Sequence, residues 1–166
     1  MRDDGAAVLE AIPALLKPAQ AVLFFSLLLA VSVWDLKWRK IPDQLQAGIA
    51  ALALLDFSPW LAFSPWNLAG ILCMLPYLGI ALSSKGEDRI GGGDVKLVGS
   101  TGLVLGLPAA LTASILGLAA FVLYGAGTLA WKRIQGKKKE NPLPLGPFLA
   151  AGCIIAYFMK MGGQIR

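Results

Sequence analysis

Six apolar stretches, each with few or no charged residues, dominate this chain of 166 residues. Crossing a hydrocarbon core of roughly 30 Å takes about 20 residues of helix. Only 15% of the residues are charged, against about 25% in soluble domains. The stretches cover approximately residues 19–34, 44–61, 66–82, 95–107, 109–131 and 145–161, of which the second and fourth are short. The sequence therefore predicts one all-α domain over residues 1–166, a polytopic integral membrane protein with about six transmembrane helices in a lipid bilayer.

The cations gather in alternate connections between these stretches. Lys37, Arg39 and Lys40 follow the first stretch, Lys85 and Arg89 follow the third, and Lys132, Arg133 and the lysines at 137–139 follow the fifth. By the positive-inside rule these connections face the cytoplasm, so an even number of spans puts both termini on the other side. The net charge of +5 is thus a topology signal, and since no nucleic-acid module is visible, no nucleic-acid partner is predicted.

Histidine and cysteine usage narrows the possible chemistry. The chain has no histidine, and its two cysteines, Cys73 and Cys153, each sit alone within an apolar stretch. Ser-His and Cys-His catalytic pairs and the H-E-x-x-H zinc helix are therefore excluded. A disulfide framework or a paired-cysteine zinc site has no support either. An enzyme with this sequence has to work with carboxylates, amines or hydroxyls.

Two acids stand at the edges of apolar stretches. Asp35 lies at the predicted cytoplasmic end of the first stretch, and Asp94 begins the fourth, directly after three glycines. A carboxylate at that depth is costly unless it faces protein or water, which makes it a functional candidate. Taken singly, Asp35 could instead be the first polar residue past the boundary, paired with Lys37 or Arg39, and Asp94 a plain helix cap. Together they lie at similar depth, because one helix ends where the other begins.

Glycines surround the second of these acids. Those at 91–93 permit positive φ and the close approach of another chain. Gly99, Gly102 and Gly106, along the following helix, are expected to let it pack against the first helix, which would bring the two acids together. Two facing carboxylates that share a proton can activate water for peptide hydrolysis.

Three segments now match a known family. The aspartate at 35 followed by RKIPD at 39–43, GGGDVKL at 91–97, and PLGPFLA at 144–150 occur in this order. In combination they resemble the prepilin peptidases, polytopic aspartyl proteases of the G-x-G-D class. The resemblance implies an aspartic endopeptidase that removes the short basic leader from type IV prepilins or pseudopilins, at the cytoplasmic face of the cell inner membrane. It assigns the catalytic pair to Asp35 and Asp94, and the motif glycines to Gly91 and Gly93.

The resemblance also bears on subtype and cofactors. In size the sequence is similar to the small six-helix members that process Flp-type pilins of tight-adherence systems. Larger members carry a cytoplasmic insertion with paired Cys-x-x-Cys motifs and have an N-methyltransferase activity. This sequence has neither the insertion nor the paired cysteines. The peptidase alone is thus implied, with no cofactor and no zinc. Leu145 stands where the family often has an aromatic residue, and is expected to be a packing variation. The pilin and the oligomeric state stay open.

Other charged residues near the two acids each have two interpretations. Lys96 matches a lysine common in the family and could tune the pair or contact substrate, or simply snorkel to the membrane surface. Glu87 and Asp88 could attract a basic leader or belong to a solvated loop. Asp43 is expected to cap the second helix through its side chain.

Alternatives from other classes remain at this point. A small transporter or channel subunit could use the two acids to bind a cation or relay protons, although no internal repeat is visible and both acids lie at the membrane edge. A noncatalytic subunit of a secretion apparatus could use the glycines for helix packing. An archaeal preflagellin peptidase would share the pair of acids and differ in substrate.

Overall fold

The computed structural model describes residues 3–55, 65–83, 91–135 and 143–165, and every regular element in these ranges is a helix. In chain order these are α1 (Asp3–Trp38), α2 (Asp43–Leu52), η1 (Ala53–Leu55), α3 (Pro65–Gly70), η2 (Ile71–Cys73), α4 (Met74–Ser83), α5 (Gly92–Leu105), α6 (Leu107–Ile134) and α7 (Gly146–Met161), where η marks a short 3-10 helix. The predicted all-α fold is confirmed, and a helix lies in each of the six predicted stretches.

Three described segments are long and apolar enough to cross a membrane: Lys17–Trp38, Pro65–Ser83 (which joins α3, η2 and α4) and Leu107–Ile134. α7 is also apolar but shorter, with 16 residues. Large apolar side chains on these helices face outward, such as Leu123 at 74% and Ile134 at 81% exposure. An apolar exterior of this kind suits contact with lipid tails. The chain is a polytopic membrane protein, as predicted.

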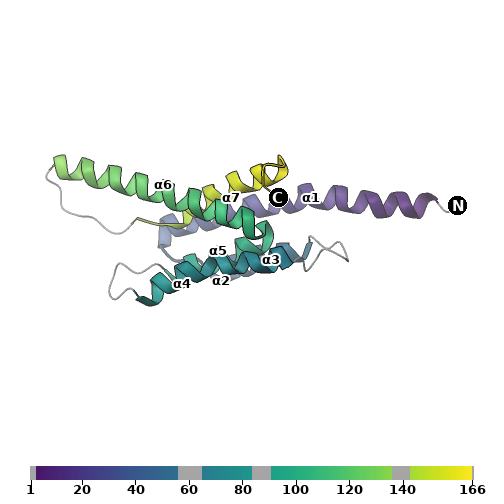
Figure 1. Ribbon diagram of the computed structural model, residues 1–166, viewed down its shortest axis with the longest axis horizontal. Coiled ribbons are helices and arrows are strands. Elements are labelled where there is room, and N and C mark those ends of the chain that lie inside the picture. The colour runs from purple at the N-terminus through teal and green to yellow at the C-terminus, as the bar shows by residue number, and fades with distance from the viewer. Residues whose placement is uncertain (1–2, 56–64, 84–90, 136–142, 166) are drawn as a thin grey trace.

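The helices form two layers, with α1, α6 and α7 in one and α2, α3, α4 and α5 in the other (Figure 1). α5 contacts helices of both layers, namely α2, α3, α4, α6 and α7. Nine of its 14 residues are buried, so it has no single apolar face. α1, α4 and α6 end on the side where α2, α5 and α7 begin (Figure 1). The first residues of α5 and α7 are thereby brought near the end of α1.

The glycines of α5 do not face α1, and the prediction that they would is wrong. Gly99 lies against Met74 of α4, and Gly102 meets the backbone of Gly70 in α3, while Gly106 adjoins the start of α3. α1 packs instead on α2 and α7. Small-residue spacing indicates that some helix can approach closely, but it does not identify which one.

The contact between Gly102 and Gly70 predicts a strong dependence of stability on residue size. A Cβ added at Gly102 would overlap the carbonyl group of Gly70, so Gly102→Ala is expected to cost about 1–3 kcal/mol through overpacking. Gly79→Ala is the matched control, because no atom lies within 4 Å of a Cβ at that position. Thermal unfolding in detergent should show a lower midpoint for Gly102→Ala alone; equal midpoints would contradict this packing.

Candidate active site

Asp35 lies in the last turn of α1 and is only 6% exposed. Its Oδ2 accepts a hydrogen bond of 2.9 Å from the backbone N–H of Gly146. Gly146 is the first residue of α7, and the first N–H groups of a helix have no partner within that helix. The buried carboxyl therefore receives a donor from the positive end of a second helix, and its pairing with Lys37 or Arg39 is not needed to explain its position.

Gly146 is a site residue that was not singled out from the sequence, although it lies in the PLGPFLA segment. A Cβ at this position would come within 2.7 Å of Asp35 Oδ2 and 3.1 Å of its Cβ and Cγ. The absence of a side chain thus lets α7 begin directly against the carboxyl. The local signal was present, because proline favours the first turn of a helix and Pro147 follows this glycine.

Asp94 is the third residue of α5 and lies outside the three candidate membrane spans. Burial raises the pKa of Asp94 to about 6, the charge of Asp35 acts in the same direction, and a hydrogen bond from the backbone N–H of Gly91 opposes both. Its Oδ1 is buried and has no hydrogen-bond partner among the described residues. The two acids are therefore close enough for the charge of Asp35 to raise the pKa of Asp94, as expected. Their helices, α1 and α5, share the neighbours α2 and α7 and do not pack on each other along their lengths.

The three glycines before Asp94 have ordinary backbone torsions, and what matters at Gly93 is the small size of the residue. Gly91 is extended, with φ −62°, and precedes α5, whereas Gly92 and Gly93 are already helical. Among the described glycines only Gly106 and Gly163 have positive φ, so the expectation of positive φ at 91–93 is wrong. Close approach is confirmed at Gly93, where an added Cβ would lie 3.2 Å from Cβ of Ile41.

Lys96 forms an ion pair with Asp43, with 2.8 Å between Nζ and Oδ1. The predicted side-chain cap at Asp43 is wrong, because Pro42 occupies the N-cap position and α2 shows no side-chain cap bond. Both side chains are largely exposed, at 59% and 75%, so the pair contributes little to stability. It joins the first residue of α2 to α5, two residues after Asp94 in the sequence.

The structure describes only one of the three remaining residues that were named from the sequence. Leu145 is 8% exposed and belongs to the apolar core, which confirms its packing role. Glu87 and Asp88 lie outside the described residues. No group of three or more His, Cys, Asp or Glu residues that could hold a metal ion occurs in the described parts of the chain.

Gln46 is a second residue near the acids that sequence reasoning missed. It is 4% exposed, at the end of the first turn of α2, and its Nε2 donates a hydrogen bond of 2.9 Å to the carbonyl oxygen of Gly93. Its Oε1 is buried and has no partner within the described ranges. A glutamine in a short helix gives no local signal of such a contact.

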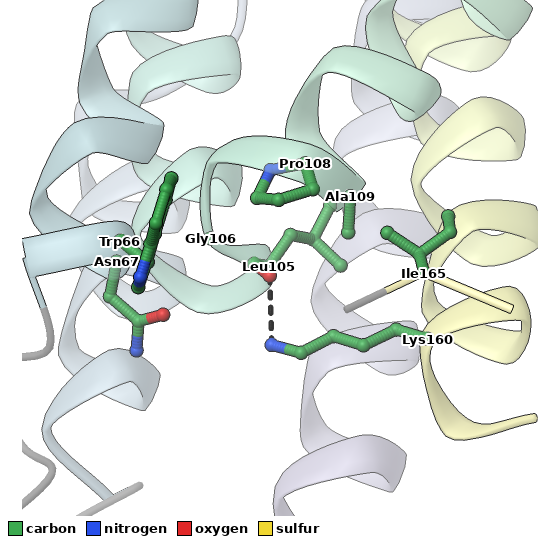
Figure 2. A pocket seen from close by; sticks show the side chains of 8 residues that line it. All are labelled: Trp66, Asn67, Leu105, Gly106, Pro108, Ala109, Lys160 and Ile165. Carbon is green, nitrogen blue, oxygen red and sulfur yellow. Dashed lines mark hydrogen bonds between the residues drawn. The ribbon is translucent and has the colours of Figure 1, made fainter. Parts of the chain in front are cut away.

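A cavity of about 320 Å³ lies at the other end of α5 and α7, away from the two acids. Its lining residues are Trp66, Asn67, Leu105, Gly106, Pro108, Ala109, Lys160 and Ile165 (Figure 2). Lys160 crosses it and donates a hydrogen bond of 2.8 Å to the carbonyl oxygen of Leu105. This side chain caps the last turn of α5, and none of the described residues that line the cavity is an acid, so the candidate site stays at Asp35 and Asp94.

The arrangement has the groups that hydrolysis by paired carboxyls requires. Two such groups in a shared buried setting cannot both ionise freely, so one can take a proton from water while the other donates one. The buried, unpartnered Oδ1 of Asp94 leaves an acceptor for that water.

Comparison with known proteins agrees with this chemistry. Residues 22–126 match the type IV leader peptidase family. A prepilin leader peptidase/N-methyltransferase of Bacillus subtilis (strain 168) is 34% identical over 146 residues, 82% of this chain and 54% of the relative. Proteins of the same description from Pectobacterium carotovorum subsp. carotovorum and Dickeya chrysanthemi are 30% and 31% identical, over 84% and 86% of this chain and 51% of each relative. The chain spans about half the length of these curated relatives. No solved structure matches it.

Proposed function

The chain belongs to the type IV leader peptidase family, and from this premise we propose that it is a membrane-embedded aspartic endopeptidase acting on type IV prepilins or pseudopilins. The observation that carries the proposal is the pair of acids. Asp35 and Asp94, far apart in the sequence, interact in a setting where Asp35 is buried and one oxygen of Asp94 has no partner. A transporter or scaffold role finds no comparable support, because the similar proteins are described as prepilin leader peptidases.

In the proposed reaction the two carboxyls act as one unit. The ionised carboxylate takes a proton from water, whose oxygen attacks the carbonyl carbon of the scissile peptide bond, while the protonated carboxyl donates its proton to the carbonyl oxygen. The carbon–nitrogen bond then breaks, and the departing amine takes up the proton that the first carboxylate removed. One of the two hydroxyls on the carbon returns its proton to the second carboxylate as the new carboxylic acid forms, so the pair regains its starting protonation. Water and peptide are consumed and two shorter chains result, without any further reactant.

The proposed substrate is a prepilin with a short basic leader, a glycine at the cleavage point and a hydrophobic helix. The similarity to small six-helix members favours Flp-type prepilins. Lys37 lies in the last turn of α1, and Lys132 and Arg133 lie in the last turn of α6. These two helices end on the side where α5 begins (Figure 1). By the positive-inside rule that side faces the cytoplasm, where a basic leader of a protein in the cell inner membrane would lie.

Co-expression with a short Flp-type prepilin tests this proposal. Membranes with the wild-type chain should contain the pilin without its leader, seen as a gel shift, and mass spectrometry should place the new N-terminus directly after the leader's final glycine. Membranes without the chain provide the baseline. Full-length prepilin in both membranes, with the chain inserted, would overturn the proposed substrate class.

A further inference from the structure

We propose that Gln46 is a positioning residue of this site, which holds the carbonyl of Gly93 and so sets the direction in which Asp94 presents its carboxyl. The inference rests on the proposed peptidase function. It adds a residue outside the three family-like segments, on an element that contributes no acid to the pair.

The first step is the bond itself. Nε2 of Gln46 lies 2.9 Å from the carbonyl oxygen of Gly93, and the carbon of that carbonyl is covalently joined to the backbone nitrogen of Asp94. Since a peptide unit is planar, a group that holds the Gly93 oxygen also restrains the backbone of Asp94. α2 thereby fixes the start of α5 from the side.

The second step explains why a glycine precedes Asp94. A Cβ at Gly93 would lie 3.6 Å from Nε2 of Gln46, 3.5 Å from the backbone nitrogen of Ile41 and 3.2 Å from its Cβ. The contact with Cβ of Ile41, two residues before α2, is the tight one, and the other two distances are ordinary van der Waals contacts. The absence of a side chain at Gly93 therefore lets the segment that leads into α2 lie close to the backbone next to the acid, where Gln46 reaches it.

The third step concerns the other end of the amide. Only the NH₂ group of Gln46 can donate to the Gly93 carbonyl, so the orientation of the side chain is determined and Oε1 points elsewhere. That oxygen is buried without a partner among the described residues, as is Oδ1 of Asp94. Buried acceptors without donors are rare. Gln46 and Asp94 each contribute one such acceptor, and each acceptor can take an O–H or N–H donor, which water and a peptide substrate both supply.

A purely structural role for Gln46 has a matched comparison in the same protein. Gln20 of α1 is also buried, at 7% exposure, and its Nε2 donates a bond of the same length, 2.9 Å, to the carbonyl oxygen of Leu52. Leu52 ends α2, whereas Gln46 lies near its start. The two glutamines differ in their distance along α2 from the acids, so Gln20 reports what loss of such a bond does to folding alone.

The experiment compares kcat, KM and thermal unfolding of purified wild type, Gln46→Met and Gln20→Met with a prepilin substrate in proteoliposomes. Methionine keeps the length of glutamine and removes both hydrogen-bonding ends. Gln46→Met should lower kcat by about 10- to 100-fold with little change in KM, as expected for a misplaced catalytic group, and Gln20→Met should keep a kcat near that of wild type. Equal kcat values for the two variants would overturn the proposal.

Gln46→Glu adds a readout that a structural role would not change. A protonated glutamic acid can donate to the Gly93 carbonyl, but an ionised one cannot. The activity of Gln46→Glu relative to wild type should therefore rise as the pH falls, and a ratio independent of pH would contradict the proposal. Cleavage by wild type separates the peptidase hypothesis from the hypothesis about Gln46. If wild type cleaves and the Gln46 variants do not behave as expected, only the role of Gln46 is overturned. An inactive wild type overturns both.

Discussion

Asp35→Asn and Asp94→Asn are each expected to lower the rate of prepilin cleavage by at least about 10³-fold, the scale of loss when a member of a catalytic unit is removed. Asparagine keeps the shape of aspartate but can neither take nor give the proton that the reaction needs. At position 35 its carbonyl oxygen can still accept the bond from the N–H of Gly146, so the fold should survive. Rates in proteoliposomes, corrected for inserted protein, measure the effect.

Asp43→Asn is the matched control for these variants. It makes the same chemical change at an acid that is exposed and pairs with Lys96, so cleavage should stay near the wild-type rate. Wild-type cleavage by either Asp35→Asn or Asp94→Asn would contradict the assignment. A drop of similar size in Asp43→Asn would show that the assay reports general damage.

Gly146→Ala carries the second large expected effect. The added methyl group would come within 2.7 Å of Asp35 Oδ2, so either the carboxyl or the start of α7 has to move and the hydrogen bond between them is strained. A displacement on the order of 1 Å at a catalytic group can cost about 10²-fold in rate. We therefore expect a loss of that size in kcat, measured with the same prepilin and with folding followed by thermal unfolding.

Gly125→Ala controls for the loss of a glycine within a helix. A Cβ at Gly125 would meet no atom within 4 Å, so this variant should cleave at the wild-type rate. If Gly146→Ala also cleaves at that rate while folded, the contact between α7 and Asp35 does not matter for the reaction. A loss of folded protein in Gly146→Ala would instead show that the contact supports the bundle.

The helices could be predicted because their signal is local. Length and apolar composition predicted residues 66–82, 109–131 and 145–161, and the structure has helical segments at Pro65–Ser83, Leu107–Ile134 and Gly146–Met161. The approach of the two acids to each other was also predicted, since a carboxylate at membrane depth is costly unless it faces protein or water and the surrounding segments resemble a family. Both signals require only the sequence near each residue.

The predictions that were wrong concerned contacts with residues that are distant in the sequence. Gly102 had the right character for close packing, but its partner is Gly70 of α3 and not α1. Asp43 had the right type for a cap, but α2 uses Pro42 at that position, and the carboxylate pairs with Lys96 instead. The residue type indicates which contacts are possible at a position, and the tertiary structure determines which of these contacts forms.

The residues missed altogether, Gly146 and Gln46, each make a hydrogen bond in which one partner is a backbone group. Gly146 touches Asp35 only because α7 begins at that point beside the end of α1, and Gln46 touches Gly93 only because α2 crosses the start of α5. Neither glycine nor glutamine has a type that signals catalysis. Their roles follow from the direction of one N–H group in each case, which no spacing in the sequence encodes.

The most direct test of the central claim, that Asp35 and Asp94 act as one unit, is the single-turnover cleavage rate of the double variant Asp35→Asn, Asp94→Asn beside the two single variants. When two groups act as one unit, removing either of them already abolishes the joint effect on the rate. The double variant should therefore be no slower than either single variant. If the two losses multiply, or if one single variant retains the wild-type rate, the acids act separately and the account of this site is wrong.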